Sequence, residues 1–211
     1  MKSFLKRLIR LILGLLIFSL GIVITLKANI GYPPWDVFHA GIAQVTGLSI
    51  GVASIIVGFC VVGIVTALGE KIGFGTLVCI PVTGVLIDLL GKFIPTAENT
   101  FLGLVMLVIG LVIISLGSYF YLSSAFGAGP RDNLMIVLKR KTKLPVGICR
   151  SIVEVSAVIV GWALGGMVGI GTVISAFGIG LCIQVIFSIF RFDPSAVKHE
   201  TIIQTFRRLV R

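Results

Sequence analysis

Long apolar stretches separated by short polar segments dominate the chain. Six of them reach the length of about 20 residues that a helix needs to cross the hydrocarbon core of a bilayer. They cover residues 8–26, 48–68, 72–90, 101–122, 144–164 and 169–190. The pattern predicts an all-α polytopic membrane protein with six transmembrane helices, forming a single membrane domain over residues 1–211.

Composition supports this prediction. Of the 211 residues, 57% are hydrophobic and only 12% are charged, against roughly 45–50% and about 25% in soluble domains. The formal net charge of +10 would suit a nucleic-acid binder if the basic residues covered one soluble face, but they gather at alternate ends of the apolar stretches. We therefore expect the lipid bilayer as a partner, and no nucleic acid.

The basic residues also predict the orientation of the chain. They cluster before the first apolar stretch, between the fourth and the fifth, and after the sixth. The positive-inside rule places all three segments, and with them both termini, in the cytoplasm. The last segment, 191–211, alternates apolar and basic residues and is expected to be an amphipathic cytoplasmic tail on the anionic inner leaflet.

The sequence repeats itself at an offset of 96 residues. Matching positions are Gly31 and Gly127, Pro34 and Pro130, Asp36 and Asp132, Gly51 and Gly147, and Thr76 and Thr172. Each copy, about 8–92 and about 101–190, holds three expected spans. Because three is odd, the second copy must enter the membrane from the opposite side. The sequence thus predicts two inverted repeats related by a pseudo-two-fold axis in the membrane plane, an architecture of many secondary carriers.

Each copy has a polar interruption between its first and second spans, with the pattern Gly-x-x-Pro-x-Asp. The two forms are Gly31-Tyr32-Pro33-Pro34-Trp35-Asp36 and Gly127-Ala128-Gly129-Pro130-Arg131-Asp132. Proline at the first helical position and an acidic residue in the first turn are typical of a helix start. We expect a short amphipathic helix in each copy, too short to span, which either lies on the surface or dips into the protein.

The two aspartates allow two interpretations. They could merely complete a helix start, or they could line a cavity as gate or ligand groups. Their neighbours differ, Trp35 in one copy and Arg131 in the other, which would give the inverted pair two chemically unlike mouths. Trp35 could equally be an interfacial anchor, and Arg131 a positive-inside charge.

Two charges lie inside the fifth stretch. An ionisable group at the centre of a span costs at least about 2.5–3.5 kcal/mol, so such groups usually face a protein interior or water. Arg150 and Glu154 are four residues apart and can pair along one helix face; Arg150 could instead snorkel to the membrane surface. The candidate substrate-binding residues are therefore Asp36, Asp132, Trp35, Arg131, Pro34, Pro130, Arg150 and Glu154.

Other chemistry has little support. The four cysteines stand singly in different apolar stretches, and neither His39 nor His199 has a cluster of carboxylates or cysteines around it. The sequence offers no Ser-His or Cys-His pairing and no zinc motif. We expect no enzymatic activity, no cofactor and no metal.

The Gly31-Tyr32-Pro33-Pro34-Trp35-Asp36 element, following Ser19-Leu20-Gly21, resembles the YczE/YitT-like family of bacterial integral membrane proteins, and the likeness covers nearly the whole chain. It implies a duplicated multi-pass protein of the bacterial cytoplasmic (inner) membrane and supplies no substrate. The second copy departs from the motif with Arg131 in place of tryptophan.

These patterns favour a small-molecule carrier of unknown substrate, working by alternating access between two inverted repeats. One alternative is the substrate-binding membrane subunit of a vitamin-type ABC importer, which would need an energising partner. Another is a non-transporting scaffold. The sequence leaves open the substrate, the coupling ion, the direction of transport and whether the protein forms a homo-oligomer.

Overall fold

The computed structural model describes residues 2–70, 72–127, 129–144, 146–192, 197 and 200. These residues form eight α-helices and no strand, which confirms the all-α class. The helices are α1 (Lys2–Lys27), α2 (Pro34–Thr46), α3 (Ile50–Ala67), α4 (Phe74–Leu90), α5 (Thr100–Ser123), α6 (Pro130–Thr142), α7 (Val146–Ala163) and α8 (Ile170–Ile189). Nearly all of the expected tail over 191–211 lies outside the described residues.

All six predicted apolar stretches are helical, but they differ in length and polarity. Four of the described helices, α1, α3, α5 and α8, are long and apolar enough to cross a membrane. Helix α4 is apolar but has only 17 residues. Helix α7 has 18 residues and carries Arg150 and Glu154. Length and composition therefore identify four spans, and α4 and α7 are the two that need a further argument.

The two short helices begin where the Gly-x-x-Pro-x-Asp motifs predict. Pro34 and Pro130 are the first residues of α2 and α6, and each helix has 13 residues. Proline fits this position because its fixed φ suits a helix and its missing N–H would have no helical partner there. The prediction of a short helix in each copy is confirmed.

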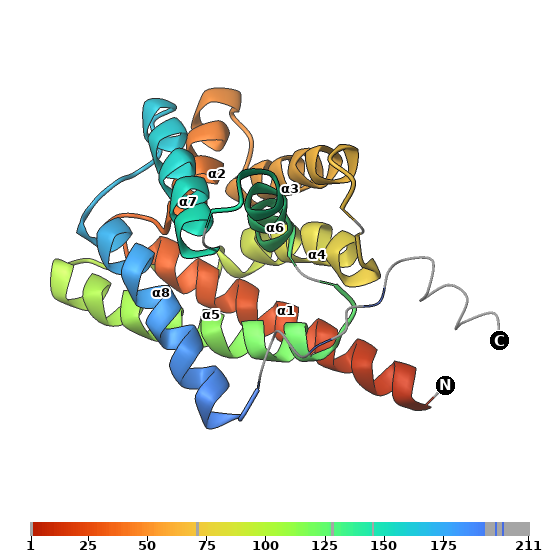
Figure 1. Cartoon of the computed structure of the whole chain (residues 1–211). Coiled ribbons are helices and arrows are strands. Elements are labelled where there is room, and N and C mark those ends of the chain that lie inside the picture. The colour runs from red at the N-terminus through yellow and green to blue at the C-terminus, as the bar shows by residue number, and fades with distance from the viewer. Residues whose placement is uncertain are drawn as a thin grey trace.

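The second half of the chain repeats the helix order of the first. Helices α6, α7 and α8 begin 96 residues after α2, α3 and α4 respectively. Helices α1 and α5 pack along each other through the middle of the molecule, with α4 on α1 and α8 on α5 (Figure 1). Helix α2 packs on α7 of the other half, and α3 packs on α6.

Equivalent residues of the two halves make equivalent contacts. The Gly75 N–H donates to the carbonyl of Phe126 at 2.8 Å, and the Gly171 N–H donates to that of Ile30 at 2.7 Å. Gly75 corresponds to Gly171 and Ile30 to Phe126. The first half therefore donates to the second the same hydrogen bond that the second donates to the first. The halves thus join each other through reciprocal contacts.

The crossing of α1 and α5 follows the same rule. A Cβ on Gly21 would lie 2.6 Å from the backbone nitrogen of Ile114, and a Cβ on Gly117 would lie 2.6 Å from the Cα of Phe18. Gly21 corresponds to Gly117 and Phe18 to Ile114. Glycine at both positions lets the two backbones touch, as small residues do between membrane helices.

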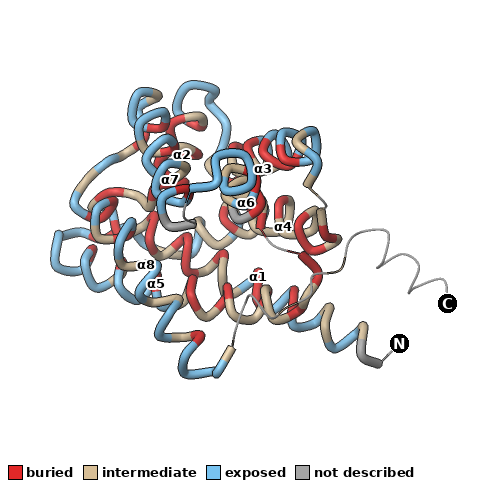
Figure 2. Tube along the Cα trace, in the orientation of Figure 1, coloured by how far each residue is buried: buried red, intermediate tan, exposed pale blue. Residues whose placement is uncertain are grey.

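Burial is concentrated where the helices face one another, and their outward faces are exposed (Figure 2). The exposed side chains include large apolar residues on several helices, such as Phe101, Trp162 and Phe177. Such faces are stable only against an apolar surrounding, as lipid provides. The exposed apolar surface agrees with a membrane-embedded chain.

Candidate functional site

A cavity of about 650 Å³ lies among the helices, within the range of about 300–1,000 Å³ that is usual for small-molecule sites. Residues of all eight helices line it. Its walls are mostly apolar, with Phe18, Trp35 and Phe187 among the larger side chains. The charged residues of its lining are Asp36, Arg131, Arg150 and Glu154, and His39 lies among them.

Both short helices start at this cavity. Pro33 and Pro34 at the beginning of α2, and Gly129 and Pro130 at the beginning of α6, belong to its lining. The N-terminal end of a helix carries a partial positive charge of about half a unit, which favours anionic groups. Two such ends therefore meet the cavity from opposite halves of the chain.

Glycines position these helix starts. Gly31 has φ +112°, and a Cβ there would lie 2.6 Å from the backbone nitrogen of Gly169. Gly127 has φ +133°, and a Cβ there would lie 2.8 Å from the Cα of Gly73. Only glycine tolerates both this backbone conformation and this approach. The first glycine of each motif thus lets the chain cross the start of the last helix of the other half.

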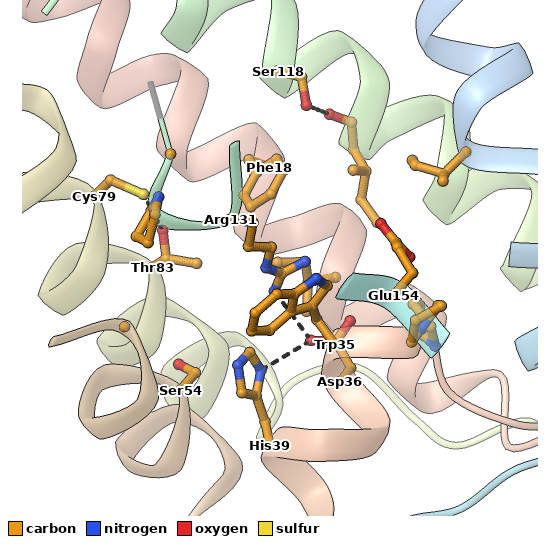
Figure 3. Close-up of a pocket in the computed structure, with 18 of the residues that line it drawn as sticks. Phe18, Trp35, Asp36, His39, Ser54, Cys79, Thr83, Ser118, Arg131 and Glu154 are labelled. Carbon is orange, nitrogen blue, oxygen red and sulfur yellow. Dashed lines mark hydrogen bonds and ion pairs between the residues drawn. The ribbon is translucent and has the colours of Figure 1, made fainter. Parts of the chain in front are cut away.

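Asp36 is the most buried charged group of the site, with 2% of its side chain exposed. Its Oδ1 lies 3.3 Å from Nδ1 of His39, one turn along α2, and 3.8 Å from Nη2 of Arg131 on α6 (Figure 3). Because a carboxylate can only accept, the imidazole serves Asp36 as an Nδ1–H donor. Asp36 therefore joins a residue of its own helix to one from the other half.

Arg131 also covers the ring of Trp35, with its guanidinium carbon 5.1 Å from the ring centroid. This geometry is that of a cation–π contact. The two copies of the motif consequently meet in one place. Both short helices begin at the same cavity, so the two motifs lie beside each other rather than at two separate mouths.

Arg150 and Glu154 pair along α7 as predicted, with Nε 3.5 Å from Oε1, and both line the same cavity. Seven of the eight candidate residues are thus brought together. They are Pro34, Trp35, Asp36, Pro130, Arg131, Arg150 and Glu154. The eighth, Asp132, is a residue of α6 whose side chain lies outside the described part of the structure.

The sequence interpretation missed His39. We expected no cluster of carboxylates or cysteines around it and did not count it among the site residues, whereas Asp36 is its partner. The three-residue spacing of Asp36 and His39 on an expected helix places both side chains on one face and was the available signal. The sequence suggested a solvated Asp88, whereas in the structure Asp88 accepts hydrogen bonds from the Ser49 hydroxyl and, at 2.9 Å, from the Gly51 N–H.

The two side walls of the cavity are packed differently. Helices α3 and α4 are in close contact, and a Cβ on Gly84 of α4 would lie 2.6 Å from the carbonyl oxygen of Gly51 on α3. The equivalent of Gly84 is Gly180 on α8, where an added Cβ would meet no described atom within 4 Å. Across their described residues, α7 and α8 do not form a packed seam of the kind that joins α3 and α4.

The sequence of the whole helical region also matches a known family. The model of the family of unknown function DUF6198 covers residues 5–188. The chain belongs to this family. The cavity and both Gly-x-x-Pro-x-Asp motifs fall within the matched residues, so the site belongs to the part of the DUF6198 chain that the family shares.

Curated relatives agree with the expected resemblance to YczE/YitT-like proteins, which is confirmed. The uncharacterized membrane protein YczE of Bacillus subtilis (strain 168) is 35% identical over 176 residues, which is 81% of this chain and 80% of the relative. An uncharacterized protein of Haemophilus influenzae is 32% identical over 184 residues, 87% of this chain and 84% of the relative. No solved structure matches the chain. With the apolar helices, these relatives identify this DUF6198 member as a membrane protein.

Proposed function

We propose that this DUF6198 member is a small-molecule carrier of the bacterial cytoplasmic membrane, in which two inverted three-span repeats expose a central cavity alternately to the two sides. The observation that carries the proposal is the position of the cavity. It lies where the two halves meet, equivalent residues of both halves line it, and its two equivalent walls are packed differently.

Reciprocal contacts support the inverted arrangement. When residue i of one half contacts residue j of the other, and their equivalents contact in the reverse sense, the halves are related by a two-fold axis. The Gly75–Phe126 and Gly171–Ile30 hydrogen bonds follow this rule. Glu200 pairs with Arg7 at 2.6 Å, which places a residue that follows α8 beside α1 and favours the segments before α1 and after α8 on one side, the cytoplasm.

The proposal counts α4 and α7 as spans. At 1.5 Å per residue the 17 residues of α4 are about 26 Å long, close to the roughly 30 Å of a hydrocarbon core. Arg150 and Glu154 of α7 line the cavity, so their charges do not have to face lipid. Neither helix therefore counts against a six-span topology.

Alternating access explains why the two equivalent helix pairs, α3–α4 and α7–α8, are packed differently. The α3–α4 seam joins the first turns of α3 to the last turns of α4, which the six-span topology places near the outer face. The equivalent ends of α7 and α8 lie near the cytoplasmic face. A closed α3–α4 seam and an unpacked α7–α8 seam therefore correspond to a state open toward the cytoplasm. Exchange of the two packings between the halves would open the cavity outward.

The inverted topology is tested by a matched pair of single cysteines. Leu48 and Leu144 are equivalent exposed positions that follow α2 and α6. In a chain whose native cysteines are replaced by alanine or serine, a membrane-impermeant maleimide should reach Leu48→Cys only from outside and Leu144→Cys only from the cytoplasm. Labelling of both from the same face would rule out the inverted repeat. Copurification with an ATPase would instead indicate an importer subunit.

A further inference from the structure

We infer that the cavity takes an amphiphilic organic anion, with its carboxylate or phosphate group held by Arg131 and Arg150 and its apolar body against the walls. This inference rests on the proposed function in taking the cavity as the substrate site. A soluble metabolite and an anionic membrane lipid share this chemistry.

The two guanidiniums have hydrogen-bonding capacity that none of the described residues uses. An arginine presents five N–H donors. Arg131 approaches Asp36 only to 3.8 Å, and Arg150 approaches Glu154 only to 3.5 Å. Among the described residues neither guanidinium makes a hydrogen bond, although 37% of the Arg131 side chain and 45% of the Arg150 side chain are exposed. The N–H donors of both guanidiniums therefore remain available to a ligand.

The charge balance of the cavity favours an anion. Among the described side chains of the lining, two guanidiniums stand against the carboxylates of Asp36 and Glu154. The N-terminal ends of α2 and α6 add about half a positive charge each. His39 adds a further positive charge only when it is protonated. Over these described groups the sum is about one positive charge before a ligand enters, which a single anionic group would neutralise.

The choice of arginine and the apolar walls narrow the class further. The planar guanidinium fork matches the oxygens of a carboxylate or phosphate group better than a lysine ammonium does. The remaining lining is mostly apolar, and Trp35 offers a ring already held beside Arg131. A small inorganic anion would leave these walls empty, whereas an anion with an aromatic or aliphatic body would fill them.

The test is a thermal-shift measurement on the full chain in detergent with probes that differ only in their head group. One series is indole-3-acetate, indole-3-acetamide and tryptamine, and a second has naphthyl carboxylate, phosphate, amide and amine members. We expect anionic members to raise Tm by about 5 °C at roughly a hundred times Kd, and their neutral and cationic partners to leave it unchanged. Dioleoyl phosphatidylglycerol, set against dioleoyl phosphatidylcholine, distinguishes a lipid ligand from a soluble one.

Variants locate the binding site. Arg131→Gln and Arg150→Gln should each weaken anion binding by at least about tenfold, since each removes a charged donor group. Lys141→Gln removes one positive charge from the exposed end of α6 and should leave binding unchanged. The inference is overturned if the amines bind instead, if the arginine variants bind anions normally, or if no anion shifts Tm. If an amine probe protects the cavity residue Cys79 from alkylation by a thiol reagent, the inference of an anionic ligand is rejected, whereas the proposed carrier function is not.

Discussion

Trp35 and Arg131 occupy equivalent positions of the two repeats and stack on each other at the cavity, with the guanidinium carbon 5.1 Å from the ring centroid. Equivalent residues of a two-fold arrangement touch only close to the axis that relates them. Their chemical difference stabilises the contact, because two arginines would repel each other there. The departure of the second motif from the first is thus what allows both to meet.

The unequal helix seams lead to a prediction about paired glycines. Gly84→Val should push α3 away from α4, because its Cβ would already approach the Gly51 carbonyl to 2.6 Å. A Cβ on Gly180 meets no atom of the described residues within 4 Å, so Gly180→Val should fold with a Tm within a few degrees of the unaltered chain. If α7 and α8 must close during transport, Gly180→Val should nevertheless reduce uptake into proteoliposomes at least tenfold. Normal uptake by Gly180→Val would show that this seam never closes.

A second prediction concerns the start of α3. Asp88→Ala removes the acceptor for the Ser49 hydroxyl and the Gly51 N–H, and should lower the free energy of unfolding by about 1–3 kcal/mol. The equivalent residue on α8 is Gln184, which is exposed. Gln184→Ala should therefore change the free energy of unfolding by less than about 0.5 kcal/mol. Denaturant titration in detergent measures both. Equal losses in the two variants would mean that Asp88 has no special role in the α3–α4 seam.

The carboxylates of the cavity should differ in their effect on stability. Asp36→Ala leaves the buried ring of His39 without its partner, which should cost about 1–3 kcal/mol. Glu154→Ala leaves Arg150 without its partner, but the Arg150 side chain is 45% exposed and stays solvated. The free energy of unfolding should therefore fall by less than about 1 kcal/mol. The same denaturant titration compares the two variants. A larger loss for Glu154→Ala would contradict the assignment of Asp36 as the central buried group.

Much of the architecture could be predicted because it depends on local pattern. Hydrophobic stretches indicated the long helices, proline and aspartate indicated the starts of α2 and α6, and the 96-residue offset matched the helix bounds. The pairing of Arg150 with Glu154 was also predictable from their spacing on one helix.

Contacts between distant helices could not be predicted in this way. The sequence period does not say that α2 packs on α7 or that Arg131 reaches Asp36, since these contacts depend on how the helices cross. Nor does the sequence say that Gly73 and Gly169, just before α4 and α8, give room for the opposite chain to cross.

The most direct test of the central claim uses Cys79, which lines the cavity, as the only cysteine of the chain. A membrane-impermeant thiol reagent is applied to right-side-out and inside-out vesicles, with and without Gly180→Val. Alternating access predicts modification from both sides in the parent chain and from the cytoplasmic side alone in Gly180→Val. Modification of the parent from one side only, or two-sided modification that Gly180→Val leaves unchanged, would contradict a carrier mechanism.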